Sequence, residues 1–288
     1  MNQNDRFVNV IIPTYKDWDL LKLCLDALRK QTYPQELFNV LVVNNDQEST
    51  FDDRFEIADN VTMLNEKKPG SYAARNKALQ YADGKYVGFT DSDCIPDSNW
   101  IKNAVEMFEK KPEIDRIGGR MKMFCPNDKT TLGDLYDQTF AFPQKDYVKG
   151  GFAVTGNLFV RRHIFDTVGL FDDNLMSGGD SKWGLTARDK GVNIVYSDDI
   201  FVNHPTRSSI KELKIKTVRI GKGLRKVFKD EKKPKFLSLI YIYLRFNLKR
   251  FYQETKMKNP KLTSWEARKV SLLHSYLLFL RDVEKYKS

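Results

Sequence analysis

Apolar and amphipathic segments alternate along the first two thirds of the chain. Largely apolar runs are typical of strands buried on both faces, and we predict strands at residues 7–12, 38–43, 61–64, 86–89, 116–124, 155–162 and 192–196. Apolar residues at helical spacing predict helices at residues 19–30, 70–79, 96–110, 163–168 and 181–190. This alternation predicts an α/β fold with a mostly parallel, Rossmann-like sheet, right-handed crossovers and flanking helices. Residues 125–150 show no clear pattern, so we predict no regular elements there.

The end of the chain has a different character. From Ser208 onward it carries 22 Lys and Arg against 7 Asp and Glu, whereas the residues before it carry 26 against 31. Amphipathic or apolar patterns predict helices at residues 210–227, 236–252 and 264–283. The sequence therefore predicts a globular domain at residues 1–207 and a basic α-helical extension at residues 208–288.

The positive charge of the extension favours an anionic partner, either a membrane surface or nucleic acid. Aromatic and aliphatic residues opposite Arg and Lys fit the interface of an anionic membrane. Packing on the first domain and assembly into a homo-oligomer remain open as alternatives. Nucleic acid is not favoured, because the first domain has no basic stripe interleaved with aromatic residues.

Composition bounds the class of protein. The chain has 288 residues, 41% of them hydrophobic, which is enough for a sizeable core. Its three cysteines, Cys24, Cys94 and Cys125, have no metal-type spacing and indicate reduced thiols and a cytoplasmic setting. The first residues lack the pattern of a signal peptide, and no apolar run approaches the ~20 residues that span a bilayer. We expect a cytoplasmic protein that could lie peripherally at the inner face of the cell membrane.

Two carboxylates follow the apolar run at residues 86–89. Asp91 and Asp93 are two residues apart, so on an extended chain both side chains point to the same side. A cation between them would offset their repulsion, and oxygen ligands suit Mg²⁺ or Mn²⁺. Taken alone, the pair is more often a solvated turn. However, polar clusters also follow the strands at residues 7–12 and 38–43, and the carboxyl ends of parallel strands form one ligand-binding edge.

Further short motifs stand in order between residues 7 and 207. They are VIIPTY at 10–15, VVNND at 42–46, GSYAARN at 70–76, FTDSD at 89–93, TGN at 155–157, VGLFD at 168–172, GGD at 178–180 with Arg188, and HP at 204–205. Through these motifs the chain resembles the family 2 glycosyltransferases, which are inverting enzymes of the GT-A fold that use nucleotide-diphosphate sugars. The resemblance covers about seven tenths of the chain.

The resemblance implies a role for individual residues. A catalytic base would be Asp180, and a divalent cation, Mn²⁺ or Mg²⁺, would be held by Asp93 with Asp91 and His204. The residues implied in donor binding are Pro13, Thr14, Tyr15, Asn44, Asn45, Asp46, Arg75, Asp91 and Ser92. The acceptor side would include Trp100, Asn157 and Gly179.

The chain departs from the family pattern at three positions. Asn44 stands where Asp is usual, which leaves a uracil-type base favoured but less certain. Gly179 replaces a frequent Glu, and Lys182 replaces a frequent acid, so the acceptor is less defined. Plainer interpretations also remain: Asp180 as a helix N-terminal residue and His204 as an ordinary loop residue. For Arg75 the plainer interpretation is a surface charge.

The implied reaction is single displacement at the anomeric carbon. An acceptor hydroxyl is a poor nucleophile, so a carboxylate must take its proton, while a cation stabilises the departing diphosphate. The resemblance implies a donor sugar on a nucleotide diphosphate, most simply UDP, and an acceptor glycan or lipid-linked glycan of a bacterial surface polysaccharide. A catalytically silent nucleotide-sugar-binding relative, acting as a partner subunit, is the alternative.

Overall fold

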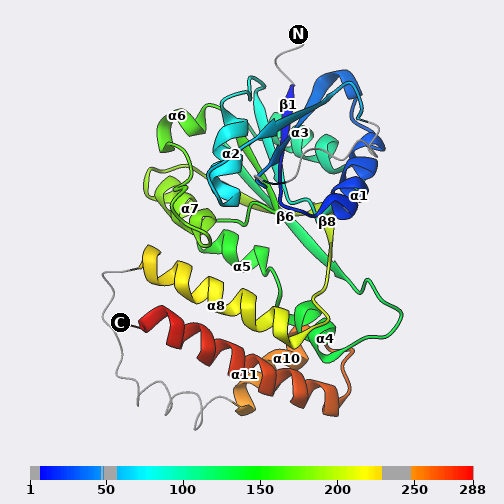
Figure 1. Ribbon diagram of the computed structural model, residues 1–288, viewed down its shortest axis with the longest axis vertical. Helices are drawn as coiled ribbons and strands as arrows, with labels where there is room; N and C mark the ends of the chain where they lie inside the picture. Colours follow the sequence, from blue (N-terminus) through cyan, green and yellow to red (C-terminus); the bar gives the residue numbers. More distant parts are fainter. Residues whose placement is uncertain (1–6, 47, 49–56, 229–247, 288) are drawn as a thin grey trace. The chain divides into compact units, whose positions relative to one another are not determined.

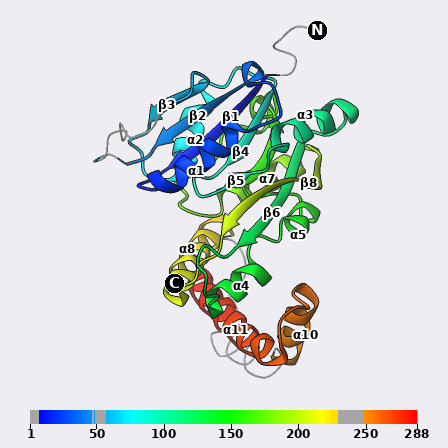
Figure 2. The ribbon, with the colours of Figure 1, turned by 90° about the vertical axis from the view of Figure 1, so that its right-hand side faces the viewer.

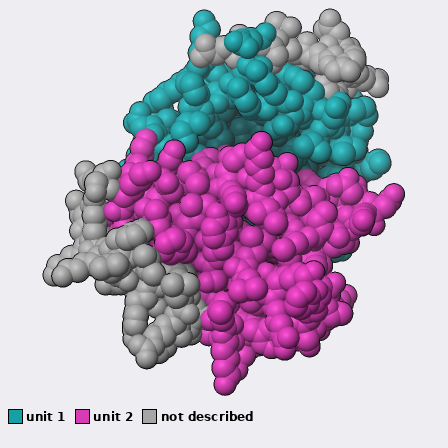
Figure 3. Space-filling model, turned by 60° about the horizontal axis from the view of Figure 1, so that its bottom comes forward, with its two compact units in different colours: residues 1–122, 142–204 teal, residues 123–141, 205–288 magenta. Residues whose placement is uncertain are grey.

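The computed structural model describes residues 7–46, 48, 57–228 and 248–287. Two compact units make up the chain (Figures 1 and 3). The first contains residues 1–122 and 142–204, and the second contains residues 123–141 and 205–288. Each unit is described separately below.

One eight-stranded sheet organises the first unit, in the order β3-β2-β1-β4-β7-β6-β8-β5. The strands are β1 Val8–Thr14, β2 Phe38–Asn44, β3 Val61–Asn65, β4 Tyr86–Thr90, β5 Ile95–Pro96, β6 Arg116–Phe124, β7 Asn157–Arg161 and β8 Ile194–Pro205. Strands β3, β2, β1 and β4 are parallel, whereas β7 pairs antiparallel with both β4 and β6. The parallel part therefore covers half of the sheet.

Helices follow most of the strands and cover the sheet (Figures 1 and 2). They are α1 Trp18–Arg29, the 3₁₀ helix η2 Gln35–Leu37, α2 Ser71–Leu79, α3 Trp100–Lys110, α5 Gln144–Lys149, α6 Ile164–Val168 and α7 Gly179–Asp189. In α1 the buried residues are Leu21, Cys24, Leu25 and Leu28, which share one face at helical spacing.

Burial explains the apolar strands. All seven residues of β1 are buried, because β2 and β4 flank it and helices cover the sheet. Between β4 and β7 the ring of Phe159 lies so close to Gly88 that an added Cβ would be 2.7 Å from it. Glycine at position 88 therefore permits the close strand pairing that fixes β4, and with it the turn that carries Asp91 and Asp93.

The predicted fold class is confirmed: the chain forms an α/β fold with C-terminal helices. Two local predictions were incomplete. The strand predicted at residues 192–196 is the beginning of a longer strand, β8, which starts at Ile194 and continues to Pro205. Within residues 125–150, for which no elements were predicted, the structure forms α4 Leu132–Phe140 and α5.

The second unit is helical. It contains α4, α8 Ile210–Val227, α10 Leu248–Lys258 and α11 Ser264–Tyr286. Helices α8 and α11 lie side by side (Figures 1 and 2), and a Cβ added at Gly221 would lie 2.5 Å from the carbonyl oxygen of Arg281. Leu213, Leu273 and Leu277 form an apolar cluster against which α4 also packs.

A buried carboxylate holds α4 to the start of α8. Asp134 is fully buried and closes a capping box with Thr131 at the beginning of α4. It also accepts hydrogen bonds from the hydroxyls of Thr206 and Ser208. Although burial acts to raise the pKa of Asp134, these hydrogen bonds outweigh it and lower the pKa below the ordinary value.

The units differ from the predicted division in one respect. Residues 123–141 group with the C-terminal helices, whereas the sequence-based boundaries place them at the interior of residues 1–207. Most of the predicted helix at 236–252 lies outside the described residues. Among the residues that the structure describes, no helix combines the length and apolar character needed to cross a membrane.

Candidate active site

Three neighbouring strands end beside one another in the first unit. β1 and β2 are parallel and in register, so Thr14 pairs with Asn44 at their carboxyl ends. β4 runs parallel on the other side of β1 and ends directly before Asp91. The topology thus gathers the polar clusters at one edge of the parallel strands, where α/β proteins bind ligands.

Asp91 and Asp93 lie on a tight turn. The backbone N–H of Cys94 donates to the carbonyl of Asp91 at 3.0 Å, as in a β-turn. The argument from an extended chain, in which both carboxylates share one side, is therefore wrong. Instead, Asp91 pairs with Arg75 and Asp93 faces His204.

Arg75 is a buried cation. Its side chain is only 3% exposed and forms an ion pair with Asp91, so it is not a surface charge. Its Nε is buried and has no hydrogen-bond partner among the described residues. Burial raises the pKa of Asp91, Arg75 opposes this rise, and the carboxylates of Asp93 and Asp180 add to it.

Asp93 and His204 form a candidate cation site. His204 Nε2 lies 3.3 Å from Asp93 Oδ2, and the Sγ of Cys94 lies within 4.8 Å of both. Burial, followed by the charges of Asp93 and Asp91, raises the pKa of Cys94 well above the ordinary value. A neutral thiol is a poor ligand, so the oxygen and imidazole donors are the better pair, and they suit Mn²⁺.

Asp180 lies in the first turn of α7. The helix begins after Gly178, whose φ of 83° is in the left-handed region that glycine tolerates. One carboxylate oxygen of Asp180 accepts a hydrogen bond from the hydroxyl of Tyr72. The other accepts from the backbone N–H of Thr155 at 3.2 Å. Asp180 therefore does not cap its own helix with its side chain.

A continuous set of contacts joins the two acidic groups. Tyr72 bonds to Asp180 and lies under Arg75, whose guanidinium carbon is 5.7 Å from the ring centroid. Arg75 in turn pairs with Asp91, which begins the turn that carries Asp93. The Asp180 carboxylate and the candidate cation site thus belong to one cluster within the first unit.

The residues implied in nucleoside binding lie at the same edge. Pro13 and Thr14 are buried and Tyr15 is 56% exposed. The hydroxyl oxygen of Thr14 is buried with no hydrogen-bond partner among the described residues. Asn44 accepts a hydrogen bond from the N–H of Asp46 at 2.9 Å. Of these residues, Tyr15 is exposed and can contact a ligand, whereas the side chains of Thr14 and Asn44 are buried.

Asn45 has a different environment. Its amide nitrogen donates to the carbonyls of Glu66 and Lys68, both at 2.8 Å. Its amide oxygen accepts from the N–H of Gly70 at 2.7 Å, directly before α2. Asn45 therefore braces the loop that leads into the helix carrying Arg75. Ser92, within the acidic turn, is 6% exposed and mostly covered.

Two residues predicted on the acceptor side lie in the core instead. Trp100 and Asn157 are both fully buried, and the indole N–H donates to the amide oxygen at 2.9 Å. The amide nitrogen of Asn157 donates to the carbonyls of Arg120 and Ile200. Fully buried and mutually bonded side chains leave no surface for an acceptor, so this prediction is wrong in its geometry. Both residues hold the sheet together.

Gly179 lies where the family resemblance places it, beside Asp180, but its contact is internal. A Cβ added at Gly179 would lie 2.7 Å from the ring of Tyr72. No role was predicted for Tyr72 or for the backbone amide of Thr155. Tyr72 and Arg75 are three residues apart on α2 and so share one helix face, which is the signal that could have identified Tyr72.

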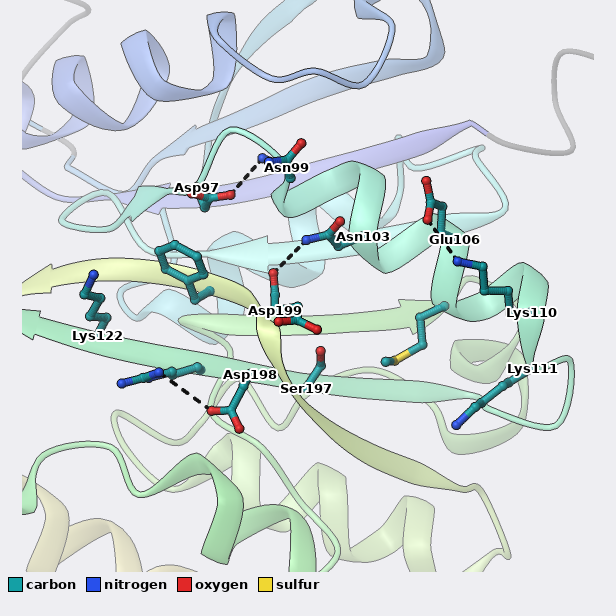
Figure 4. A pocket seen from close by; sticks show the side chains of 13 residues that line it. Asp97, Asn99, Asn103, Glu106, Lys110, Lys111, Lys122, Ser197, Asp198 and Asp199 are labelled. Carbon is teal, nitrogen blue, oxygen red and sulfur yellow. Dashed lines mark hydrogen bonds and ion pairs between the residues drawn. The ribbon is translucent and has the colours of Figure 1, made fainter.

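A separate surface hollow of about 720 Å³ lies against α3, β6 and β8 (Figure 4). Two ion pairs lie among its lining residues: Lys110 with Glu106 at 3.2 Å, and Arg120 with Asp198 at 3.9 Å. None of the acidic-cluster residues described above lines it. It has no role in the arrangement developed here.

The fold and this edge of the sheet define a class. The structure resembles a mannosyltransferase from Pyrobaculum calidifontis, solved with GDP-Man and Mn²⁺, at a TM-score of 0.62 and 18% identity over 98% of this chain and 87% of that chain. At that identity the likeness establishes the fold, which is that of the GT-A-type glycosyltransferases.

The family follows from sequence comparison. Residues 9–169 match the glycosyl transferase family 2 model. A glycosyltransferase of Haloferax volcanii, AglE, is 36% identical over 228 residues, which are 75% of this chain and 72% of that protein. A dolichyl N-acetyl-α-D-glucosaminyl phosphate 3-β-D-2,3-diacetamido-2,3-dideoxy-β-D-glucuronosyltransferase of Methanococcus voltae is 23% identical over 235 residues, covering 76% and 73% of the two chains. The chain belongs to glycosyl transferase family 2.

Proposed function

We propose that the protein transfers a sugar from a nucleoside-diphosphate donor to a hydroxyl of a lipid-linked glycan, with inversion at the anomeric carbon. The supporting observation is the contact series from Asp180 through Tyr72 and Arg75 to Asp91. It brings a proton acceptor and an anion-binding group to one edge of the sheet. Inverting transfer needs both of them at once.

In the proposed reaction, the bond between the anomeric carbon and the diphosphate oxygen breaks as the acceptor oxygen bonds to that carbon. The acceptor proton passes to Asp180. Each carboxylate oxygen of Asp180 already accepts one hydrogen bond. Because each has two lone pairs, a lone pair remains for the acceptor. A single carboxylate suffices for single displacement, whereas retention by double displacement requires a second one as nucleophile.

The donor diphosphate would lie beside Arg75. The Arg75 side chain is 3% exposed and its Nε is buried, so its positive charge, rather than a direct contact through Nε, would attract the diphosphate. Asp93 and His204 would hold a divalent cation, Mn²⁺ or Mg²⁺, whereas Asp91 on the same turn is paired with Arg75. When bound, such a cation supplies Lewis-acid stabilisation of the leaving diphosphate.

For the nucleoside we propose uridine. The support comes from a second solved structural neighbour, TarS of S. aureus, which was bound to UDP-GlcNAc. Asn44 itself is buried and bonded to Asp46, so it would shape this part of the site rather than contact the base. The solved mannosyltransferase was bound to GDP-Man, so guanosine donors are the natural competitor. The acceptor class is supported by the relative from Methanococcus voltae, whose name specifies a dolichyl-linked sugar.

A membrane-facing surface in the second unit would give access to such an acceptor. On α11, Trp265, Lys269, Leu272 and Tyr276 are exposed and fall on one helix face. Lys214 of α8 lies 5.0 Å from the ring of Tyr276 and extends this face. We refer to these five residues as the aromatic–basic face. Interfacial aromatic residues beside lysines suit an anionic membrane surface.

The test of the reaction is Asp180→Asn. The amide keeps the side-chain shape but cannot accept the acceptor proton, so transfer should fall by about 10²–10⁴-fold. Binding of UDP or GDP, measured by calorimetry in Mn²⁺, should stay within about twofold of wild type, because Asp180 does not contact the donor diphosphate in the proposed geometry. Inversion would be read from the anomeric configuration of the product by NMR.

Two outcomes would overturn the proposal. Transfer that persists in Asp180→Asn would exclude this residue as the base. A wild-type protein that binds nucleotide sugars yet transfers none to any glycan or lipid-linked acceptor would instead favour the silent, partner-subunit alternative.

A further inference from the structure

Tyr72 is the described side chain that touches both halves of the acidic cluster. It lies in the first turn of α2, is 5% exposed, and donates its hydroxyl hydrogen to the Asp180 carboxylate. The same hydroxyl oxygen lies 3.4 Å from the backbone nitrogen of Asp180 and accepts from it. One hydroxyl therefore binds both the side chain and the backbone of the same residue.

The ring of Tyr72 lies against Arg75, the residue that we place beside the donor diphosphate. The guanidinium carbon of Arg75 lies 5.7 Å from the ring centroid, in cation–π geometry. The ring of Phe171 lies 5.9 Å away and limits the movement of the Tyr72 ring. Tyr72 is thus packed on one side while its hydroxyl points at the carboxylate.

The sequence provides space for this arrangement at one position. Gly179 directly precedes Asp180, and any Cβ there would come within 2.7 Å of the Tyr72 ring. Real Cβ atoms do not approach a ring so closely. The glycine at 179 and the tyrosine at 72 are therefore a matched pair: the small residue admits the ring, and the ring places its hydroxyl on the next side chain.

We propose that Tyr72 is a positioning residue that orients the Asp180 carboxylate for proton abstraction, and that Gly179 is required because it admits the Tyr72 ring. This inference rests on the proposed function and deepens it. With one carboxylate oxygen held by Tyr72 and the other by the N–H of Thr155, the carboxylate plane is fixed. A fixed base places its remaining lone pair at the acceptor without an entropic penalty during reaction.

The hydroxyl remains a donor throughout the working pH range. Burial raises the pKa of Tyr72 well above the ordinary value, and the neighbouring Asp180 charge raises it further. Tyr72 therefore does not itself ionise to become the base. Its contribution is to orient the Asp180 carboxylate.

The experiment uses Tyr72→Phe in the full chain, which keeps the ring, the Arg75 contact and the packing but removes the hydroxyl. We expect kcat to fall about tenfold to hundredfold, a part of what a general base contributes, while binding of UDP or GDP and the thermal midpoint stay near wild type. Tyr81→Phe is the matched control, because Tyr81 follows the same helix but is 50% exposed. It should leave kcat unchanged.

Combining Tyr72→Phe with Asp180→Asn distinguishes a role in orienting Asp180 from a general structural role. If Tyr72 acts only through Asp180, Tyr72→Phe should have no further effect on the residual rate of Asp180→Asn. A purely structural role would lower the rate in both backgrounds by the same factor. Gly179→Ala, which displaces the ring without removing the hydroxyl, should reproduce the loss in kcat with nucleotide binding retained.

Three results would overturn the inference. They are a kcat for Tyr72→Phe within twofold of wild type, an equal loss in the Asp180→Asn background, and a parallel loss of nucleotide binding that would assign Tyr72 to the donor side. If Asp180→Asn itself remained active, the proposed function would fail instead, so the two failures can be distinguished.

Discussion

Asp93 and Asp91 are two residues apart but have different surroundings. Asp91 is held by Arg75, whereas Asp93 faces an imidazole at 3.3 Å. The opposite charge of a guanidinium already balances Asp91. Asp93 is therefore the carboxylate whose charge a cation would most strongly offset.

This difference gives a prediction for Asp93→Ala. Because a charged ligand to the cation is lost, binding of UDP or GDP should weaken about tenfold to hundredfold in Mn²⁺. In a chelator the variant and the wild type should bind equally. Calorimetric titration under both conditions provides the measurement.

Asp166→Ala is the matched control, because its carboxylate is 73% exposed and lies outside the cluster. It should bind nucleotide as the wild type does in both conditions. An equal loss for Asp93→Ala with and without chelator would count against the cation role and assign Asp93 directly to the nucleotide.

At the residue scale, the sequence motifs predicted which residues gather in one cluster better than they predicted where each side chain points. Motif order identified Arg75, Asp91, Asp93 and Asp180, and all four lie in one cluster. It did not reveal that Trp100 and Asn157 bond to each other in the core. Side-chain direction depends on turns and packing, which residue types alone do not specify, and the site roles of all these residues remain predictions.

At the scale of elements, the first turn of α4 shows how one side chain can join two helices. Asp134 accepts hydrogen bonds from Thr131 in its own cap and from Thr206 and Ser208 before α8. Because these hydrogen bonds favour the ionised form of Asp134, the free energy of unfolding of the second unit should depend on pH.

The sign of this coupling follows from the lowered pKa of Asp134. Its stabilisation is fully present above the unfolded-state value of about 3.9 and is lost as pH falls through the lower folded-state value. Asp134→Asn should reduce the free energy of unfolding by about 1–3 kcal/mol at pH 7. The difference from wild type should shrink at pH values below the folded-state pKa. Urea unfolding followed by circular dichroism at both pH values measures it.

Asp128→Asn offers the matched comparison, because Asp128 is an exposed carboxylate in the same segment. It should leave the urea midpoint unchanged at either pH. A pH-independent loss in Asp134→Asn would show that shape rather than charge is responsible.

Elements were predicted well where the apolar pattern was strong. The strands at residues 7–12, 38–43 and 86–89 lie within a residue or two of β1, β2 and β4, because burial on both faces demands continuous apolar residues. The helix α4 was not predicted because a capping box and contacts with helices far away in the sequence determine its position. Such tertiary contacts leave only a weak local periodicity.

At the scale of the whole molecule, the chain divides into two compact units, and its residues 208–288 carry most of the excess positive charge. The sequence identified the basic character of the end of the chain from composition. It could not show that residues 123–141 join that part, because their grouping depends on contacts between segments far apart in the sequence.

The aromatic–basic face gives a prediction for the full chain. The protein should float with vesicles that contain phosphatidylglycerol and should not bind vesicles of phosphatidylcholine alone. Its binding should weaken as the salt concentration rises. Lys214→Glu with Lys269→Glu should lower the membrane-binding constant about tenfold or more, since each lysine near an anionic surface contributes about 1 kcal/mol. Flotation and sedimentation provide the measurement.

Lys110→Glu with Lys111→Glu makes the same charge change at the last residue and the C-cap of α3 in the first unit, and it should leave vesicle binding intact. Equal binding to both lipids, or none, would argue against the membrane proposal. Loss of a dimer in Lys214→Glu with Lys269→Glu, seen by light scattering without lipid, would assign the face to self-association.

The amide of Asn45 has a consequence for which substitutions this position can accept. Both of its functional atoms are occupied by backbone groups of the loop before α2. A carboxylate would lose the donor and a longer amide would overreach, so asparagine alone satisfies the loop. A substitution at position 45 would therefore first displace the helix that carries Arg75 and Tyr72, rather than change which nucleotide binds.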